Sequence, residues 1–311
     1  MIKYDFKIEF YNSHILDNST TGDSIPEDNP KIVIETHNGI HVDISISDLY
    51  SSYKYVASKQ AKLTLWNLPL DFTESIKEGD IVKIFYKKFY DAKQYDFIMA
   101  GYLGVPMSTD YPSGDFSVDL ELHLASKSNF FNRKLENTQF KGMTVEDAIK
   151  SAFPNRNIIN MSIKDRSTII TESFYAETPK EFVEKITKKY VQNIKTDIGN
   201  NNGVECNYIF TNINLSEPDS KYIPLEYFGL EFIPQQEISI GTTRKIRMIY
   251  WRAKIMYTHT LKVGTKVSFI DSLGQKIKNT ILETSAILSN TGECSLMLKL
   301  HDDSNHIKIE G

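Results

Sequence analysis

A short phrase that occurs twice is the feature that most constrains the fold of this chain. Residues 76–85 read IKEGDIVKIF and residues 261–269 read LKVGTKVSF. In both, a lysine, one further residue, a glycine and a polar residue lead into a short alternating strand. Glycine suits such a turn because it adopts a positive φ without steric penalty. Each occurrence therefore predicts a turn that starts a strand, once near Gly79 and once near Gly264.

The first part of the chain is predicted to be entirely β. Residues 31–47 alternate between apolar and polar side chains on both sides of His37-Asn38-Gly39, and Asn-Gly between alternating runs is a strong hairpin signal. Further runs follow at 60–68, 77–89, 95–104 and 115–126. Short strands at this spacing predict a barrel or a sandwich. The polar stretch 17–30 predicts a long loop.

The middle of the chain changes character. Residues 143–153 begin with Thr144 at an N-cap position, and residues 177–191 begin with Thr178, which Pro179 follows at N1. Both segments show an apolar stripe of helical period, so we predict two helices among short strands. Strands are expected again at 245–257, 261–271 and 276–288, with a hairpin at 287–300. We expect three domains, which cover residues 1–134, 135–215 and 216–311.

Composition and charge argue against several classes of function. Charged residues make up 24% of the chain and the formal net charge is −4, whereas binders of nucleic acid or anionic membranes are more often basic. Cys206 and Cys294 match no metal-binding spacing, and we expect both to be reduced. The N-terminal residues lack the apolar core of a signal peptide, and no run approaches the ~20 apolar residues of a membrane span. A soluble protein made in the cytoplasm is expected.

A search for catalytic and ligand-binding motifs finds none. The chain has no phosphate-binding loop, no dinucleotide fingerprint, no zinc-protease helix and no nucleophile elbow. His37 and His41 flank the predicted turn and would face one another loosely, so a metal site is imaginable there, but further ligands are lacking. We therefore predict no catalytic, cofactor-binding or metal-binding residues, no cofactor and no enzymatic activity.

Acidic and aromatic residues give no stronger signal. Asp302-Asp303 and Glu27-Asp28 lie in loop-like or terminal segments, and we interpret them as solvated acids. Trp66 and Trp251 lie inside strand patterns, so that packing in a core or an interface is favoured over stacking on a sugar.

The segment 60–104 is the most specific part of the sequence. It reads QAKLTLWNLPLDFTESIKEGDIVKIFYKKFYDAKQYDFIMAGYLG. A strand ends in Trp66-Asn67-Leu68, a polar segment leads to the Lys77-Glu-Gly79-Asp80 turn, and an alternating strand and an apolar strand follow. This order of elements resembles the first domain of the baseplate hub proteins of contractile-tailed phages.

The resemblance continues through the rest of the chain. MTVEDAIKSAF and PKEFVEKITKKYV are similar to the two helices of that family, and LEYFGLEFIPQQ (225–236) to the segment that returns to its last β-domain. THTLKVGTKVSFID and ILETSAILSNTGECSLMLKL resemble the turn and the closing hairpin of that domain. Two departures are that Thr265 replaces the usual acidic residue after Gly264, with no proline before it, and that the loop 17–30 is extra. The composition also resembles an uncharacterised family carried on Borrelia plasmid prophages.

The resemblance implies a β-rich α+β fold, with two similar β-barrel domains and a small α+β domain inserted between them. It implies a structural tail protein. Three protomers, each supplying two barrels, would form a pseudo-sixfold ring that joins the tail tube to the central spike and lets DNA pass through its lumen. The expected partners are two further copies, the tail tube protein, the spike and other baseplate proteins, with no sequence-specific DNA binding and no membrane anchor. The expected location is the virion tail, after synthesis in the bacterial host cytoplasm.

Two other classes of protein stay open. A β-rich chain without catalytic motifs is also typical of a receptor- or glycan-binding tail protein, which should expose aromatic clusters on loops. A tail-associated wall hydrolase would need an appended catalytic domain. We favour the hub, because Trp66 and Trp251 lie in strands and the chain has no spare length for a catalytic domain.

Overall fold

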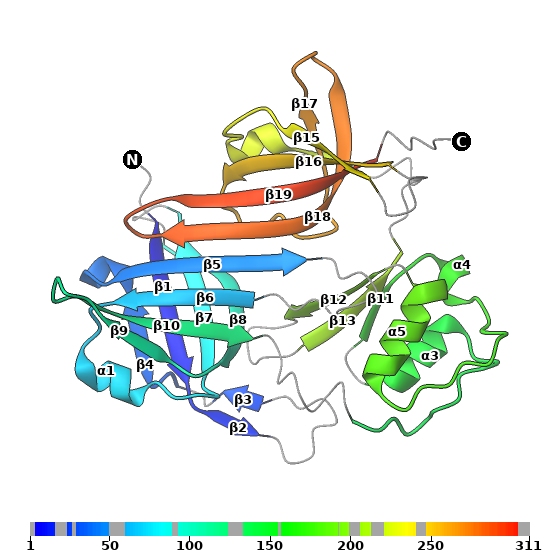
Figure 1. Cartoon of the computed structure of the whole chain (residues 1–311), viewed down its shortest axis with the longest axis horizontal. Coiled ribbons are helices and arrows are strands. Elements are labelled where there is room, and N and C mark those ends of the chain that lie inside the picture. Colours follow the sequence, from blue (N-terminus) through cyan, green and yellow to red (C-terminus); the bar gives the residue numbers. More distant parts are fainter. Residues whose placement is uncertain are drawn as a thin grey trace. The chain divides into compact units, whose positions relative to one another are not determined.

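The structure of the chain is a computed structural model (Figure 1). It describes residues 4–15, 24–26, 29–49, 60–88, 93–123, 133–154, 157–191, 193–198, 206–212, 221–240 and 247–303. The chain divides into two compact units. Unit 1 comprises Met1–Val42 and Tyr50–Ile213, and unit 2 comprises Asp43–Leu49 and Asn214–Gly311.

An antiparallel sheet forms the first part of unit 1. Its strands lie in the order β6-β10-β8-β7-β1-β4, and β9 pairs with β10. The strands are β1 (Asp5–Tyr11), β4 (Ile32–Glu35), β6 (Gln60–Trp66), β7 (Ile81–Lys87), β8 (Asp96–Leu103), β9 (Met107–Asp110) and β10 (Phe116–His123). The other elements of this part are the hairpin β2 (Ser13–Ile15) and β3 (Ser24–Pro26), the 3-10 helix η1 (Thr36–Asn38) and helix α1 (Leu70–Ser75).

Alternation of side chains explains why these segments form strands. In β6, Ala61, Leu63 and Leu65 are buried and the residues between them are more exposed, which is the period-two pattern of a strand with one covered face. β1 likewise buries Phe6 and Ile8 almost completely. The core of this sheet therefore consists of aliphatic and phenyl side chains from alternate positions.

The predicted hairpin around His37-Asn38-Gly39 is wrong. The chain does turn there, with Gly39 at φ 95°, but the turn follows a 3-10 helix and the strands on its two sides do not pair with each other. β4 pairs with β1, and residues Asp43–Leu49 of β5 (His41–Leu49) pair with β18 (Lys276–Ser289) of unit 2. The Asn-Gly signal predicted the turn correctly but not the partners of its strands.

A small α+β part completes unit 1, and its two predicted helices are confirmed. Thr144 caps α3 (Val145–Ala152) and Thr178 caps α5 (Pro179–Lys189), each accepting a hydrogen bond from the backbone N–H three residues later. Five phenyl rings, one of them from α5 itself, pack together in this part: Phe140, Phe153, Phe174, Phe182 and Phe210. The remaining elements are α4 (Ile163–Arg166) and a sheet with the order β11 (Asn157–Asn160), β13 (Cys206–Thr211), β12 (Asn193–Ile198).

Unit 2 is a second β-sheet structure. Its main strands lie in the order β15-β16-β19-β18-β5, and β17 pairs with β18 and with β14. The elements are β14 (Ile223–Pro224), η2 (Leu225–Phe228), β15 (Gln235–Ile240), β16 (Arg247–Met256), β17 (Lys266–Ile270), β18 and β19 (Cys294–Asp302). One of its strands, β5, comes from the N-terminal part of the chain.

The β-rich α+β fold class is confirmed. Within the described residues, neither sheet closes on itself into a barrel, so both are open sheets there. No helix in the described part of the chain is long and apolar enough to cross a membrane. The division into residues 1–134, 135–215 and 216–311 stays a prediction, to which the structure adds that β5 belongs to unit 2. Within the predicted loop 17–30, Ser24–Pro26 form strand β3, which pairs with β2, so the prediction is wrong there. Most of the other residues of this stretch lie outside the described residues, as does the tail after residue 303.

Candidate functional site

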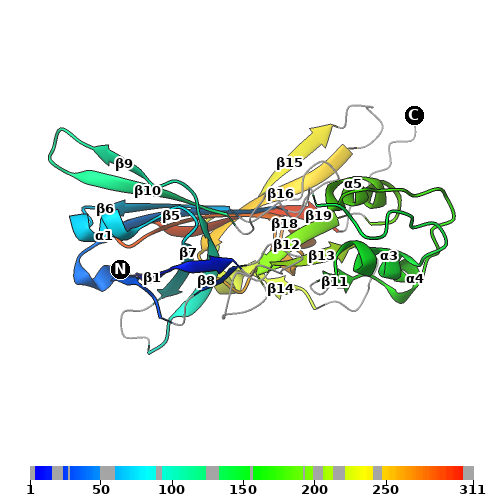
Figure 2. The same ribbon diagram turned by 90° about the horizontal axis from the view of Figure 1, so that it is seen from below.

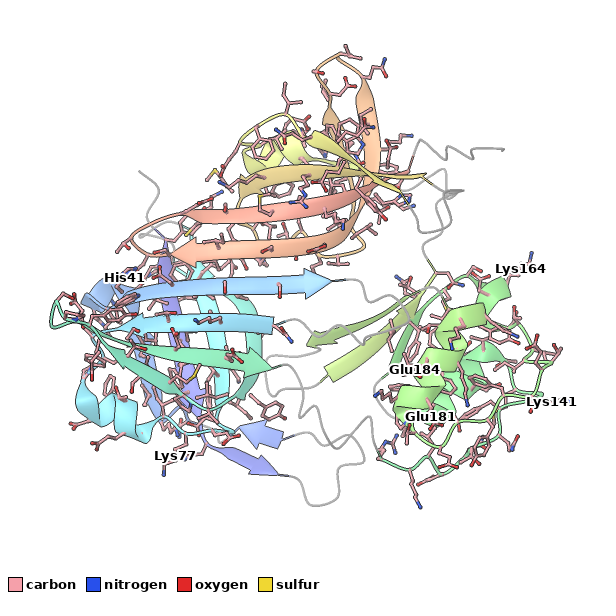
Figure 3. The ribbon with its side chains drawn as sticks, in the orientation of Figure 1. His41, Lys77, Lys141, Lys164, Glu181 and Glu184 are labelled. Carbon is pink, nitrogen blue, oxygen red and sulfur yellow. The ribbon has the colours of Figure 1, made fainter. Side chains whose placement is uncertain are left out.

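The turn at Gly79 is held by four hydrogen bonds. Lys77 N donates to Asp80 Oδ2 at 2.7 Å, and Asp80 N donates to Lys77 O at 3.2 Å. Gly79 N donates to Leu103 O and Leu103 N donates to Asp80 O, both at 2.8 Å. Gly79 has φ 86°, which a residue with a Cβ adopts only at a cost. The Lys77 side chain extends away from the strands (Figure 3).

The turn at Gly264 has the same four hydrogen bonds. Lys262 N donates to Thr265 Oγ1 at 3.2 Å, and Thr265 N donates to Lys262 O at 3.0 Å. Gly264 N donates to Ile281 O at 2.8 Å, and Ile281 N donates to Thr265 O at 3.0 Å. The Thr265 hydroxyl therefore accepts the hydrogen bond that the Asp80 carboxylate accepts in the first turn. Threonine in place of an acidic residue at position 265 therefore preserves the geometry of the turn.

Two strand pairs around these turns also match in register. Ser117–His123 of β10 pair with Trp66–Gln60 of β6, and Ser295–His301 of β19 pair with Met256–Tyr250 of β16. The two segments read SVDLELH and SLMLKLH, with Ser, Leu, Leu and His in the same places. Sequence reasoning from the glycine phrase alone missed this second repeat, although it is visible in the printed sequence.

A break in the pairing follows the braced residue in both cases. After β8 the chain leaves the strand path at Gly104, whose N–H donates to Glu121 O at 2.9 Å, before β9 resumes pairing with β10. In β18 the register shifts between Ile281 and Glu283. The chain therefore contains one β-module twice. We call residues 60–123 the first module and residues 247–302 the second module.

The two modules differ at one edge. In the second module, Ser289–Glu283 of β18 pair on their outer side with Asp43–Leu49 of β5 (Figure 1). In the first module, β9 occupies the corresponding place and pairs with β10 alone among the described residues. All four residues of β9 are exposed, and the β9–β10 ribbon extends outward in Figure 2. We call the unpaired side of Met107–Asp110 the β9 edge.

A stack of rings lies next to the end of the β9–β10 ribbon. The His41 and Trp66 rings are stacked with centroids 5.9 Å apart, and the Trp66 and Tyr111 rings are tilted with centroids 5.4 Å apart. Asn67 Nδ2 donates to Asp115 Oδ1 at 3.0 Å, and Asn67 Oδ1 accepts from the backbone N–H of Phe116. These two hydrogen bonds tie the end of β6 to the turn between β9 and β10. Trp66 thus stands at a strand end with its ring half-buried and lies against neighbouring rings.

A buried carboxylate joins four segments of unit 1. Asp5 Oδ1 accepts from Thr36 Oγ1 at 2.7 Å, and its Oδ2 accepts from Tyr95 OH at 2.5 Å and lies 3.2 Å from Lys87 Nζ. The His37 backbone N–H and ring also contact it. Burial raises the pKa of Asp5, but hydrogen bonds from Tyr95, Thr36, Lys87 and His37 outweigh burial, so the pKa lies below its ordinary value.

The structure separates the histidines that the sequence brought together. His37 bonds to Asp5, whereas His41 stacks on Trp66. Within the described ranges, no group of three or more His, Cys, Asp or Glu side chains is placed to hold a metal ion. The arrangement around Asp5 ties strands together rather than forming an open binding site.

The interpretation of Asp302-Asp303 as solvated acids is wrong. Asp302 is 1% exposed and accepts a hydrogen bond from Trp251 Nε1 at 3.0 Å. Asp303 accepts from Thr280 Oγ1 at 2.8 Å. The acidic pair therefore ends β19 inside the sheet, and Trp251 has a packing role as expected. The other pair, Glu27-Asp28, lies outside the described residues.

Cys294 has the environment of a structural residue. It is half-buried, and its thiol donates to Ser289 O at 3.1 Å. Burial raises the pKa of Cys294 to about 12, so the reactive thiolate is scarce at neutral pH. The side chain of Cys206 lies outside the described residues.

Residues 1–305 match the model of a protein family that is described as "Protein of unknown function (DUF693)". The chain belongs to this family. No curated protein matches the chain. The match covers both modules and the α+β part between them.

Several solved structures share the fold of this DUF693 protein. The 43 kDa tail protein of prophage MuSo2 from Shewanella oneidensis is 11% identical with a TM-score of 0.59, and the comparison covers 96% of this chain and 98% of that one. A tail protein from Neisseria meningitidis MC58 is also 11% identical with a TM-score of 0.59, covering 97% of each chain. The E. coli c3393 protein, a component of the type VI secretion system, is 7% identical with a TM-score of 0.56, covering 87% and 76%.

These comparisons confirm the resemblance at the level of the fold. The DUF693 chain has the fold of prophage tail proteins and of a type VI secretion component that is itself described as similar to phage T4 tail proteins. At 7–11% identity, the shared property is the architecture.

Proposed function

We propose that the chain is a structural protein of a phage tail, and that it serves as a baseplate hub. Three copies would form a ring that joins the sixfold tail tube to a threefold central spike, and DNA would pass through the lumen. The role is structural rather than enzymatic. The protein would be made in the cytoplasm of a bacterial host and would function in the virion tail.

The observation that carries the proposal is the duplicated module. The turns at Gly79 and Gly264 have the same four hydrogen bonds, and the β6–β10 and β16–β19 strand pairs share register. In both modules the strand pairing is interrupted after the residue that bonds to the turn, at Leu103 and at Ile281. A chain with two equivalent modules supplies six modules when three chains assemble. Such a trimer has true threefold and approximate sixfold symmetry, so one face can match a sixfold tube and the other a threefold spike.

The overall charge supports passage of DNA rather than binding. The formal net charge is −4. A lumen of the same sign as the phosphate backbone repels DNA, which lets it move, whereas a basic lumen would hold it. The negative charge therefore agrees with a ring through which DNA moves without sequence-specific binding.

The proposal is tested by the molar mass of the full chain in solution, measured by light scattering after size exclusion, followed by electron microscopy. One chain has a mass of 35.7 kDa, so a trimer has three times that mass, about 107 kDa. We expect that mass and a ring with a central hole and six similar densities. A monomer at all concentrations, alone and with a candidate spike protein, would contradict the hub.

One observation favours a second candidate function, a receptor- or glycan-binding tail protein. The His41, Trp66 and Tyr111 rings lie together beside the polar side chains of Asn67 and Asp115. Aromatic faces beside hydrogen-bonding groups are suited to sugar rings. Titration of the chain with host cell-wall glycans, followed by tryptophan fluorescence, separates the two. Saturable quenching that Tyr111→Ala removes would support the binder, and no change up to millimolar glycan would leave the hub.

A further inference from the structure

One edge of the β-module is covered in one copy and uncovered in the other. In the second module, β5 pairs with β18 over Asp43–Leu49, and β5 comes from the opposite half of the chain. In the first module, the corresponding β9 edge has no partner strand among the described residues. Because the modules match in their turns and in strand register, β5 beside the second module shows which kind of partner strand the β9 edge of the first module lacks.

We propose that the β9 edge of one molecule pairs with β15 of a second copy of this chain. β15 is the strand that corresponds to β5, since β15 comes directly before β16 as β5 comes directly before β6. β15 also has an open side, because it pairs only with β16 in the described part of unit 2. The pairing that β5 makes inside one chain would thus be repeated between chains. This inference rests on the proposed ring and names its interface.

The exposed side chains of the β9–β10 ribbon fit an interface. β9 is the outer strand beside β10, which pairs with β6 on its other side, and all four residues of β9 are exposed. Val105 and Met107 are 63% and 54% exposed, and Tyr111 is 39% exposed. Met107 lies in β9, and Val105 and Tyr111 flank the strand, so these exposed apolar side chains lie along the ribbon where a neighbouring molecule would cover them.

Hydrogen-bond alternation identifies the amides that face the open side of β9. Tyr111 N donates to Asp115 O at 2.8 Å, which makes these two residues a hydrogen-bonded pair. In an antiparallel ladder such pairs alternate with pairs whose amides point away. Thr109 therefore faces β10, and the amides of Ser108 and Asp110 face the open edge.

The same alternation applies to β15. Tyr257 N donates to Cys294 O at 3.1 Å, so alternate residues of β16 face β19 and the residues between them, including Arg252, face β15. Gln235 is paired with Arg252 and faces it, and the amide of Gln236 points to the open side. Ser108 and Gln236 are thus positions where proline removes an edge donor without removing a bond inside the sheet.

A head-to-tail contact makes a prediction that a symmetric contact does not. If β9 of one molecule pairs with β15 of the next, each molecule uses two different surfaces, which is the arrangement that closes into a ring. A molecule with a blocked β9 edge keeps a working β15, and a molecule with a blocked β15 keeps a working β9 edge. Mixed together, the two can form one junction and no more.

The experiment uses the full-length chain with Ser108→Pro and Gln236→Pro, and with Ser108→Ala and Gln236→Ala as matched controls. Proline is tolerated on edge strands, and a melting temperature within a few degrees of wild type shows that each variant folds. We expect both proline variants to remain at 35.7 kDa at concentrations where the wild type and the alanine controls assemble, with junctions weakened at least about tenfold. Their equimolar mixture should form a dimer of twice that mass, about 71 kDa.

The other outcomes separate this interface from the ring itself. If the wild type assembles and the folded proline variants assemble equally well, the ring stands and the β9–β15 junction is wrong. If both variants are monomeric but their mixture stays monomeric, the contact is not head-to-tail between these edges, which also overturns the junction. If the amide of Ser108 is protected from hydrogen exchange at all concentrations, a segment of the same chain covers it. If the wild type never assembles, both the β9–β15 junction and the proposed hub function are wrong.

Discussion

At the scale of single residues, Gly79 and Gly264 each hold a turn that needs a positive φ. The two positions were read from the sequence because lysine, glycine and a polar residue recur there. The hydrogen-bond partners of the two glycines, Leu103 and Ile281, cannot be predicted from the sequence in this way. A backbone carbonyl accepts a hydrogen bond whatever its side chain is, so the type of the accepting residue gives no signal.

Gly79→Ala should lower the free energy of unfolding by about 1–2 kcal/mol, the cost of a left-handed conformation for a residue with a Cβ. An added Cβ meets nothing within 4 Å, so no clash adds to this cost. Gly79→Asn is the matched control and should cost less, because asparagine tolerates this conformation. Urea unfolding with an unchanged m value measures both. An alanine variant as stable as wild type would show that the turn is not under this constraint.

Asp5→Asn should destabilise the protein by about 3 kcal/mol, since it removes the charge that neutralises the Lys87 ammonium group in a buried network. Asp110→Asn, at an exposed position on β9, is the control and should change stability by less than about 0.5 kcal/mol. Thermal unfolding at pH 7 compares them. Equal effects of the two substitutions would contradict a stabilising role for Asp5.

The pKa of Asp5 also predicts a pH dependence. Its folded-state pKa is lowered, so its contribution is fully present above the unfolded pKa of about 3.9 and is lost as pH falls through the folded value. The stability difference between wild type and Asp5→Asn should therefore be constant from pH 7 to about pH 5 and shrink below about pH 4. Guanidinium melts at each pH measure it. A difference that grows on acidification would have the wrong sign.

At the scale of elements, the modules show that different side chains can hold the same turn. In the second turn the hydroxyl of Thr265 stands where the first has the carboxylate of Asp80. Thr265→Ala should cost about 1 kcal/mol because the Lys262 amide loses its acceptor, whereas Thr265→Asp should be within about 0.5 kcal/mol of wild type. Paired urea melts decide between these. If both substitutions cost the same, the bond to Lys262 carries no stability.

The elements also show where prediction from sequence succeeds and where it stops. Thr144 and Thr178 predicted two helix starts correctly because an N-cap is a local interaction. The hairpin at Asn38-Gly39 was wrong because Asp5 binds Thr36 and the chain then leaves for a partner in unit 2. Strand partners far apart in sequence follow from the fold, which local patterns do not contain.

At the scale of the whole molecule, β5 makes unit 2 dependent on the N-terminal part of the chain. A fragment of residues 216–311 should unfold without a sharp transition, because its β18 edge is open. The same fragment with residues 41–49 added through a flexible linker should regain a cooperative thermal transition by circular dichroism. A fragment joined to a scrambled 41–49 segment is the control. Cooperative unfolding of the bare fragment would show that β5 is dispensable.

The β5–β18 pairing also determines when unit 2 can fold during synthesis of the chain. Leu49 and Glu283 are partners that lie 283 − 49 = 234 positions apart, and the chain must be translated as far as Glu283 before they can meet. At roughly 5–20 residues per second, β5 waits on the order of 10–50 s after it leaves the ribosome. During that interval unit 2 cannot form, so a chain cut short by a nonsense mutation or a stalled ribosome would never complete its second module. Only a finished polypeptide would be able to contribute both of its modules to an assembly.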